Sequence, residues 1–338
     1  MNYLNKKKQI MKIFKNLFKT VLILVLSFTA FTSCDDNDDY TPAPVPETNT
    51  IVDFVSSNSD YSILLEALIL ADGDLPSVLA GEGPFTVFAP NNAAFAAFLL
   101  DNNFGALSDI PTDVLAQVLL NHVVSGNAVS SSLTTGYEVN SLSTATPNGN
   151  SMSLYINITN GVVINGISTV TTADVSVDNG TIHAVDAVIG LPTVVTFAVA
   201  DPNFSILKTA LTRRDLTFDF VGTLSTANGT APAPFTVFAP TNDAFVDLLA
   251  ELNVTSLDDI DEPTLKGTLE MHAVAGANVL AAGLSDGMTI GTLGGNITAN
   301  ITGGATLTDA NNRVSNIIAT DVQASNGVIH AISKVLLK

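Results

Sequence analysis

An eleven-residue stretch occurs twice in this chain, and its duplication constrains the fold more than any other feature. The copies read Phe-Thr-Val-Phe-Ala-Pro-Asn-Asn-Ala-Ala-Phe at 85–95 and Phe-Thr-Val-Phe-Ala-Pro-Thr-Asn-Asp-Ala-Phe at 235–245. Three more pairs of similar segments keep the same order: 62–68 with 205–211, 121–126 with 271–276, and 179–184 with 326–331. Offsets of 143 to 150 residues far exceed a solenoid repeat of roughly 20 to 50 residues, so each copy is expected to be a whole domain.

These blocks resemble the fasciclin family, whose modules are also called FAS1 domains. The resemblance rests on Phe-Thr-Val-Phe-Ala-Pro-x-Asn-x-Ala-Phe at 85 and 235, His-x-Val at 122 and 272, and Asn-Gly-x-Ile-His-Ala at 179 and 326. It covers nearly everything from Thr50 to Lys338. Such a resemblance implies extracellular adhesion and matrix-associated modules, usually without catalysis. We therefore expect two tandem FAS1 domains, at 50–192 and 193–338.

Local patterns predict helices first and strands later in each copy. In the first copy, apolar residues at helical spacing predict one or two helices within 50–70. Aromatic residues alternating with β-branched ones predict a buried strand at 85–89, and Asn91 stands where an N-cap oxygen begins the next helix. The closing strand is expected at 181–189. The equivalent positions of the second copy are 193–211, 235–239, Thr241 and 328–337.

Between the helical part and the closing strand lie short strands separated by turn residues, such as Asn160-Gly161 and Asn165-Gly166. Helices grouped before a run of antiparallel strands are typical of the α+β class. Each domain is therefore expected to be a mainly antiparallel β-sheet wedge or sandwich with helices packed on it.

Residues 1–33 have the three zones of an export leader: a basic stretch, an apolar run from Val21 to Phe31, and the small residues Thr32 and Ser33. The apolar run is about half of the ~20 residues that span a bilayer. Small residues followed by Cys34 resemble a lipobox, which implies that Cys34 is lipidated and becomes the N-terminus of the mature protein. Ordinary cleavage that leaves a free thiol is the alternative.

A tether is predicted at 34–49, between the lipidated cysteine and the first domain. It begins with the acidic tract Asp35-Asp-Asn-Asp-Asp39, which resembles the tracts that follow the lipidated cysteine in surface-exported lipoproteins of Bacteroidota; a solvated spacer is the alternative. Alternating prolines after Tyr40 favour an extended polyproline-like segment. The expected location is the outer membrane, lipid-anchored and exposed on the cell surface.

Charge excludes some partners. Six of the 13 Lys and Arg residues precede Cys34, whereas all 32 acidic residues follow it, so the chain without its leader has seven cations and a net charge of −25. No Lys or Arg occurs between Asp35 and Leu191. Binding of nucleic acid depends on cations that displace the counterions of the phosphates, so nucleic acid is not expected as a partner. Cations or basic partners are favoured instead.

The four histidines form two equivalent pairs, His122 with His183 and His272 with His330. This regularity suggests a metal or catalytic site, but two histidines per domain are fewer than the three protein ligands of catalytic zinc. The alternative is a buried neutral imidazole bonded to backbone. We find no nucleophile elbow and no recognisable acid–base pair, so the prediction is no enzyme, no cofactor and no dedicated metal site. Weak calcium binding to acidic loops stays open.

Integrin-binding members of the family use a Tyr-His region and short Asp-Ile motifs. Here Asn121 and Met271 stand in place of the tyrosine. The possible binding residues that the resemblance implies are Asp109, Ile110, His122, Asp259, Ile260 and His272. Both Asp-Ile pairs are also explained as approaches to a helix with the acid near its N-terminus.

The leading hypothesis is a lipid-anchored surface protein that binds an extracellular protein or polysaccharide and so adheres to matrix, other cells or exopolysaccharide. A glycan-capture accessory lipoprotein is the alternative, and a secreted hydrolase is a third. The membrane contact would be the lipid on Cys34.

Overall fold

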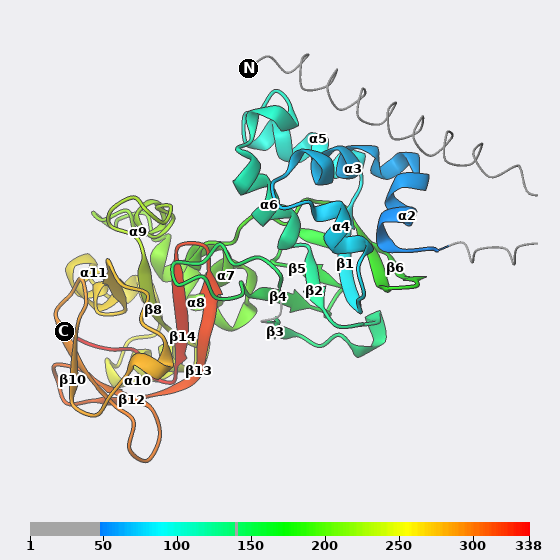
Figure 1. Ribbon diagram of the computed structural model, residues 1–338. Helices are drawn as coiled ribbons and strands as arrows, with labels where there is room; N and C mark the ends of the chain where they lie inside the picture. Colours follow the sequence, from blue (N-terminus) through cyan, green and yellow to red (C-terminus); the bar gives the residue numbers. More distant parts are fainter. Residues whose placement is uncertain (1–47, 139–140) are drawn as a thin grey trace, which may run out of the picture. The chain divides into compact units, whose positions relative to one another are not determined.

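The computed structural model describes residues 48–138 and 141–338 (Figure 1). The predicted leader, Cys34 and the tether up to residue 47 lie outside the described residues. Within them, the strands form two seven-stranded sheets, one in each repeat, and short helices accompany both. The predicted α+β class and the tandem duplication are confirmed. No described helix is both long and apolar enough to cross a membrane.

The first repeat begins with a group of short helices that lie together above the strands in Figure 1. They are α2 (Ile51–Ser57), η1 (Ser59–Tyr61), α3 (Ser62–Leu70), α4 (Leu75–Ala80), α5 (Asn92–Asp101), η2 (Leu107–Asp109) and α6 (Thr112–Leu120). The helices predicted within 50–70 are confirmed. Helix α4 was not predicted, because its one and a half turns follow Asp72-Gly-Asp74 and read as a loop.

The sheet of the first repeat is mixed rather than purely antiparallel. Its strands are β1 (Phe85–Pro90), β2 (Val123–Ser125), β3 (Gly136–Glu138), β4 (Leu154–Asn157), β5 (Val163–Ile164), β6 (Ser168–Val177) and β7 (Gly180–Val185). Their order is β2-β1-β7-β6-β5-β4-β3, and β1 with β7 is the one parallel pair among the described strands of this sheet. The last strand along the chain therefore lies in the interior of the sheet.

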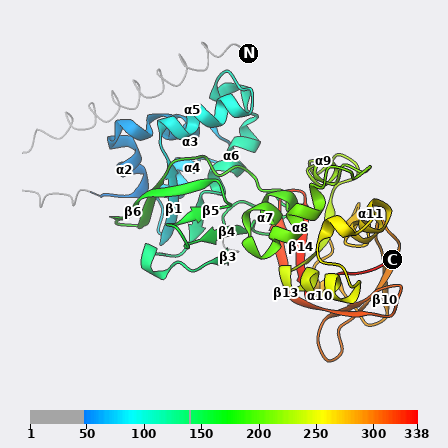
Figure 2. The same ribbon diagram turned by 180° about the vertical axis from the view of Figure 1, so that it is seen from behind.

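The second repeat follows the same plan. Figure 2 shows both repeats from behind. Its helices are α7 (Val194–Ala200), η4 (Pro202–Phe204), α8 (Ser205–Leu211), α9 (Phe220–Leu224), α10 (Asn242–Glu251), η5 (Leu257–Asp259) and α11 (Glu262–Glu270). Its strands are β8 (Phe235–Pro240), β9 (Ala273–Ala275), β10 (Met288–Gly291), β11 (Asn296–Asn300), β12 (Thr306–Thr308), β13 (Val314–Ala324) and β14 (Gly327–Ile332). The order β10-β11-β12-β13-β14-β8-β9 again places the last strand inside the sheet.

The eleven-residue stretch forms a strand, a cap and a helix, as predicted. The side-chain oxygen of Asn91 accepts the backbone N–H of Ala94 at 2.9 Å and so caps α5. Thr241 caps α10 in the same way. Phe88 and Phe95 are buried, which accounts for the recurrence of aromatic residues at these positions.

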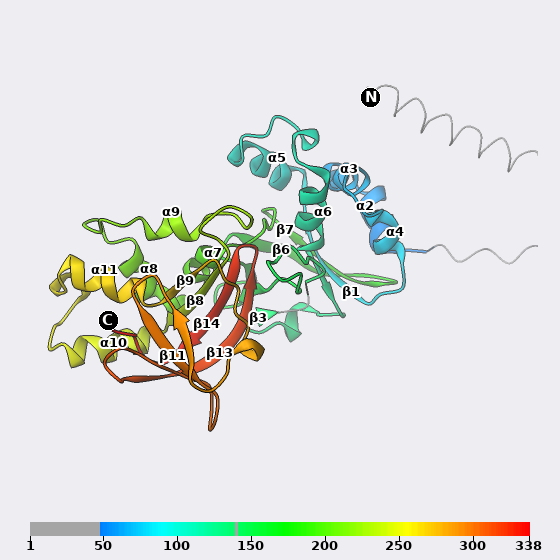
Figure 3. The same ribbon diagram turned by 60° about the vertical axis from the view of Figure 1, so that its left-hand side comes forward.

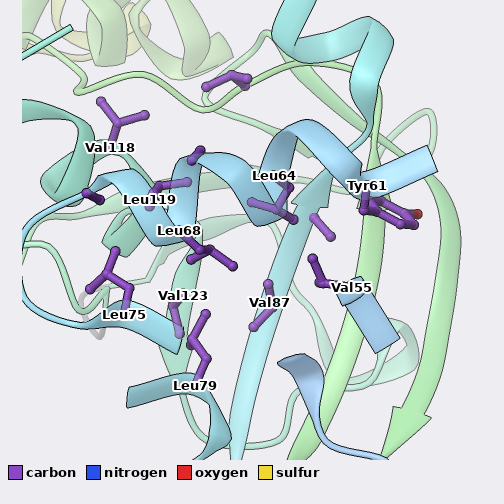
Figure 4. Packing of buried hydrophobic residues seen from close by; sticks show 14 of the residues in the cluster. Val55, Tyr61, Leu64, Leu68, Leu75, Leu79, Val87, Val118, Leu119 and Val123 are labelled. Carbon is purple, nitrogen blue, oxygen red and sulfur yellow. The ribbon is translucent and has the colours of Figure 1, made fainter. Parts of the chain in front are cut away.

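The helices of the first repeat cover one face of its sheet through a continuous apolar core (Figure 4). Val55, Leu64 and Leu68 of the opening helices pack with Val87 of β1 in this cluster. The unpredicted helix α4 adds Leu75 and Leu79, both buried. Burial of these side chains stabilises each one by roughly 1.5–3 kcal/mol relative to exposure to water.

The closing strand is shorter than predicted in both repeats. β7 ends at Val185 rather than at residue 189, and β14 ends at Ile332 rather than at residue 337. The residues that follow bond to partners outside the sheet. For example, the N–H of Ile189 donates to Nε2 of His122 at 2.8 Å. We call residues 186–191 and 333–338 the tails of the two repeats.

Asn179 explains why the second motif begins with Asn-Gly. Its side-chain oxygen accepts the N–H of Ile51 at the start of α2, at 3.0 Å. Its amide nitrogen donates to the carbonyls of Leu79 and Gly81 at the end of α4, at 2.7 and 2.9 Å. At Gly180 a Cβ atom would collide with backbone of β1, so only glycine fits there. In the second repeat Asn326 makes the matching bonds to Val194, Leu224 and Thr226.

Candidate binding site

His122 is a buried link between the end of α6 and the first tail. Its Nδ1 donates to the carbonyl of Val118 at 2.8 Å, and its Nε2 accepts the N–H of Ile189 at 2.8 Å. A backbone N–H can only donate, so Nε2 carries no proton and the imidazole is neutral. The second repeat has the same arrangement in His272, Thr268 and Leu336, at 2.8 and 2.9 Å.

Burial holds the pKa of His122 and that of His272 down, to about 4 in each case. An unfolded chain has the ordinary value, so as the pH falls through 6.5 the unfolded state takes up the proton first. The stability that these neutral rings contribute is therefore complete above pH 6.5 and is lost progressively down to about pH 4.

We expect each repeat to lose roughly 2 kcal/mol of its unfolding free energy between pH 7.5 and pH 5, because each pKa unit is worth about 1.4 kcal/mol. Urea unfolding at the two pH values measures this loss. His122→Gln is expected to lower the stability of the first repeat at pH 7.5 and to flatten its pH dependence, while the second repeat keeps its slope. An unchanged slope in the first repeat would contradict the assignment.

His183 and His330 lie on the closing strands and are bonded on both sides. Nε2 of His183 donates to the carbonyl of Ala128 at 2.9 Å, and its Nδ1 accepts the N–H of Asp174 at 3.2 Å. The ring stacks on Phe88 with centroids 5.5 Å apart. His330 has the equivalent partners Val279, Asp321 and Phe238.

Both ring nitrogens of every histidine are therefore engaged by backbone groups, as in the structural alternative drawn from the sequence. Among the described residues no group of three or more His, Cys, Asp or Glu side chains is placed to hold a metal ion.

The two Asp-Ile pairs occupy equivalent turns before α6 and α11. The carboxylate of Asp109 accepts the N–H groups of Gly105 and Ala106, at 2.8 and 3.0 Å, and thereby holds the turn. Ile110 is buried. In the second repeat the corresponding residues are Asp259, which bonds to Thr255 and Ser256, and the buried Ile260. Binding through these residues and the two buried histidines stays a prediction.

A groove of about 600 Å³ lies on the first repeat between α5, α6 and the first tail. Figure 3 shows the two helices that form its walls. Its lining is largely apolar and includes Phe98, Phe104, Ile110, Val114, Val118 and Leu191. Asp101, at the end of α5, is its one charged lining residue. Val114 is 40% exposed, so apolar surface is open to solvent here.

Of the predicted residues, only Ile110 contributes to this groove, and sequence reasoning missed its other walls. A signal was present: Arg313 and Lys334 in the second repeat align with Gly166 and Ala187 in the first. A strict comparison of the two copies would have shown that they differ at this place.

The comparisons with known proteins agree with the duplication. A family model described as the fasciclin domain matches residues 59–192 and again residues 202–338. Among solved structures, a FAS1 domain pair from the insect cell adhesion molecule fasciclin I aligns with a TM-score of 0.51 and 20% identity, covering 83% of this chain and 98% of that one. At this identity the likeness concerns the fold.

Several curated proteins are also similar. A protein of Synechocystis sp. named sll1483 is 38% identical over 140 residues, which is 41% of this chain and 72% of that protein. The pig transforming growth factor-beta-induced protein ig-h3 is 27% identical over 262 residues, 77% of this chain but 35% of that protein. Human periostin is 27% identical over 249 residues, 73% of this chain and 26% of that protein.

Proposed function

Because the chain belongs to the fasciclin family and carries its domain twice, we propose that it is a cell-surface binding protein that attaches the cell to extracellular matrix, other cells or exopolysaccharide. FAS1 domains occur in cell adhesion proteins, and the insect fasciclin I pair, which shares this fold, comes from one. The duplicated fasciclin domain is the observation that carries the proposal.

The histidine geometry supports binding rather than catalysis. A general base needs a free ring nitrogen within reach of a substrate proton. In this protein both nitrogens of each imidazole bond to backbone, and burial keeps the pKa of His122 and of His272 near 4, below that of a base working at neutral pH. With both nitrogens bonded to backbone, these rings support the fold.

The surface chemistry favours basic or neutral partners. Without its leader the chain carries a net charge of −25, which repels nucleic acid and anionic lipid headgroups. A polypeptide with basic residues, or a neutral polysaccharide, meets no such repulsion. The anchor of the proposed protein is a lipid on Cys34, and the acidic tract after it favours display on the outer face of the outer membrane.

Deletion of the gene tests this function most directly. We expect the mutant cells to attach less to protein-coated and polysaccharide-coated surfaces, and the full chain supplied in trans to restore attachment. A glycan screen with the purified protein separates adhesion to protein from glycan capture, and a panel of hydrolase substrates tests the third hypothesis. Unchanged attachment on all surfaces would refute the adhesive role.

A further inference from the structure

In the second repeat, two cationic side chains occupy the region that corresponds to the groove of the first repeat. Arg313 donates through Nη1 to the carbonyl of Val335 in the second tail at 2.7 Å, and through Nη2 to Glu251 at the end of α10. Lys334 of the same tail lies 3.3 Å from Glu251. Two cations thus tie the helix end to the tail.

The first repeat lacks these cations. Ser168 and Ser315 occupy the same place, since each hydroxyl donates to its tail, at Ala187 and Lys334 respectively. When the repeats are aligned on these two serines, Gly166 takes the position of Arg313, two residues earlier. The loop before it is also shorter, with residues 165–167 between the paired strands β5 and β6.

In the second repeat the strands β12 and β13 stay paired as far as Thr308 and Val314, and the turn between them is the longer segment 309–313, which carries Arg313. Asp309 lies in this longer turn, and its carboxylate accepts a hydrogen bond from Nη1 of Arg313 at 3.2 Å. The first repeat therefore has neither the cation nor the loop that presents it.

Both repeats nevertheless have a carboxylate at the end of the corresponding helix. Asp101 ends α5 as Glu251 ends α10, and it lines the groove. No Lys or Arg occurs between Asp35 and Leu191, and within the described residues no ion pair engages Asp101. Asp101 is exposed, and a cation that pairs with it therefore comes from outside the first repeat.

Building on the binding function proposed above, we infer that the groove receives a segment of a partner protein in which an arginine or lysine is flanked by apolar residues. The cation pairs with Asp101, as Arg313 pairs with Glu251, while the apolar side chains cover Phe98, Val114 and Leu191. Arginine is favoured over lysine because its planar guanidinium matches a carboxylate. A second copy of this chain is disfavoured, since two chains of net charge −25 repel each other.

The test titrates the isotopically labelled full chain with two short peptides and follows methyl signals by NMR. One peptide is acetyl-Leu-Arg-Val-amide, and its neutral match is acetyl-Leu-Gln-Val-amide. The arginine peptide is expected to shift the signals of Ile110, Val114 and Leu191, and to bind about fivefold more tightly than the glutamine peptide, the effect of one solvent-accessible ion pair of about 1 kcal/mol. Raising the salt concentration should reduce this preference.

Three variants locate the effect. Asp101→Asn is expected to abolish the preference for arginine and to leave the weaker apolar binding in place. Glu66→Gln removes the same charge from an exposed position on α3 and should change nothing. Ala187→Lys introduces the counterpart of Lys334 beside the groove and should reduce binding of the arginine peptide severalfold, whereas Ala187→Gln should not.

Equal binding of the two peptides, or an arginine preference that survives Asp101→Asn, would overturn the inference. So would a fatty acid or an oligosaccharide that shifts the groove signals when neither peptide does. Attachment assays keep the two proposals apart. If deletion of the gene weakens attachment to a protein-coated surface and Asp101→Asn does not, adhesion stands and this inference fails. If the peptides bind as expected and deletion changes nothing, the adhesive role fails instead.

Discussion

Replacement of Asn179 with alanine is expected to lower the unfolding free energy of the first repeat by roughly 3 kcal/mol or more. The change removes three hydrogen bonds and leaves the N–H of Ile51 and the carbonyls of Leu79 and Gly81 without these partners. Each buried group left unsatisfied costs about 1–3 kcal/mol. Because the side chain joins α2 and the end of α4 to the turn between β6 and β7, the loss loosens both helices from the sheet. Thermal unfolding should shift down by about 10 °C.

Hydrogen exchange resolves which repeat is affected. Residues 48–192 should lose protection in Asn179→Ala, whereas Asn326→Ala should have the mirror-image effect on the second repeat. Asn150→Ala provides the control, since Asn150 is exposed, and surface substitutions usually stay within about 0.5 kcal/mol. A change of less than about 1 kcal/mol in Asn179→Ala would show that the three bonds do not hold the helices in place.

Replacement of Cys34 with serine is expected to move nearly all of the protein from the membrane fraction to the soluble fraction. Acyl chains stabilise membrane attachment by about 0.8 kcal/mol for each buried CH₂ group, and a serine hydroxyl does not become the lipidated N-terminus. Fractionation followed by immunoblotting measures the shift. If ordinary cleavage occurs instead of lipidation, the unaltered protein will already be soluble.

A second variant separates anchoring from display. Changing the four aspartates of 35–39 to asparagine keeps Cys34 and should keep the protein in the membrane fraction. If the tract directs surface export, protease added to intact cells will degrade the unaltered protein and spare this variant. Membrane retention that is the same with and without Cys34 would contradict the lipid anchor itself.

Local sequence predicted the parts of the fold that depend on neighbouring residues. The strand at 85–90 follows from alternating aromatic and β-branched residues, and the helix after it follows from the oxygen of Asn91. Duplication strengthened both predictions, since the same pattern recurs 150 residues later. The parallel pairing of β1 with β7 was not predictable in this way, because the local sequence of a strand does not specify which strand it pairs with.

Features decided by distant residues escaped sequence reasoning. The early end of β7 depends on His122, whose Nε2 accepts a hydrogen bond from the N–H of Ile189, 67 positions later in the sequence. The sequence allowed buried neutral histidines as the alternative to a metal or catalytic site, but nothing in it specified their hydrogen-bond partners. Sequence patterns did not predict the groove, because it lies where the first repeat has a shorter loop than the second. A missing segment leaves no pattern of its own.

The interior position of β7 has a consequence for the order in which the protein folds. Phe85 pairs with Gly180, so the sheet of the first repeat closes only between residues 95 positions apart in the sequence. Until β7 enters between β1 and β6, both strands present open edges that invite pairing with other chains. Such non-local closure is slow. If the chain is exported from its N-terminus, as proposed, the sheet of the first repeat cannot close before residue 185 has emerged, and the interval just before closure is the one most exposed to proteases and aggregation.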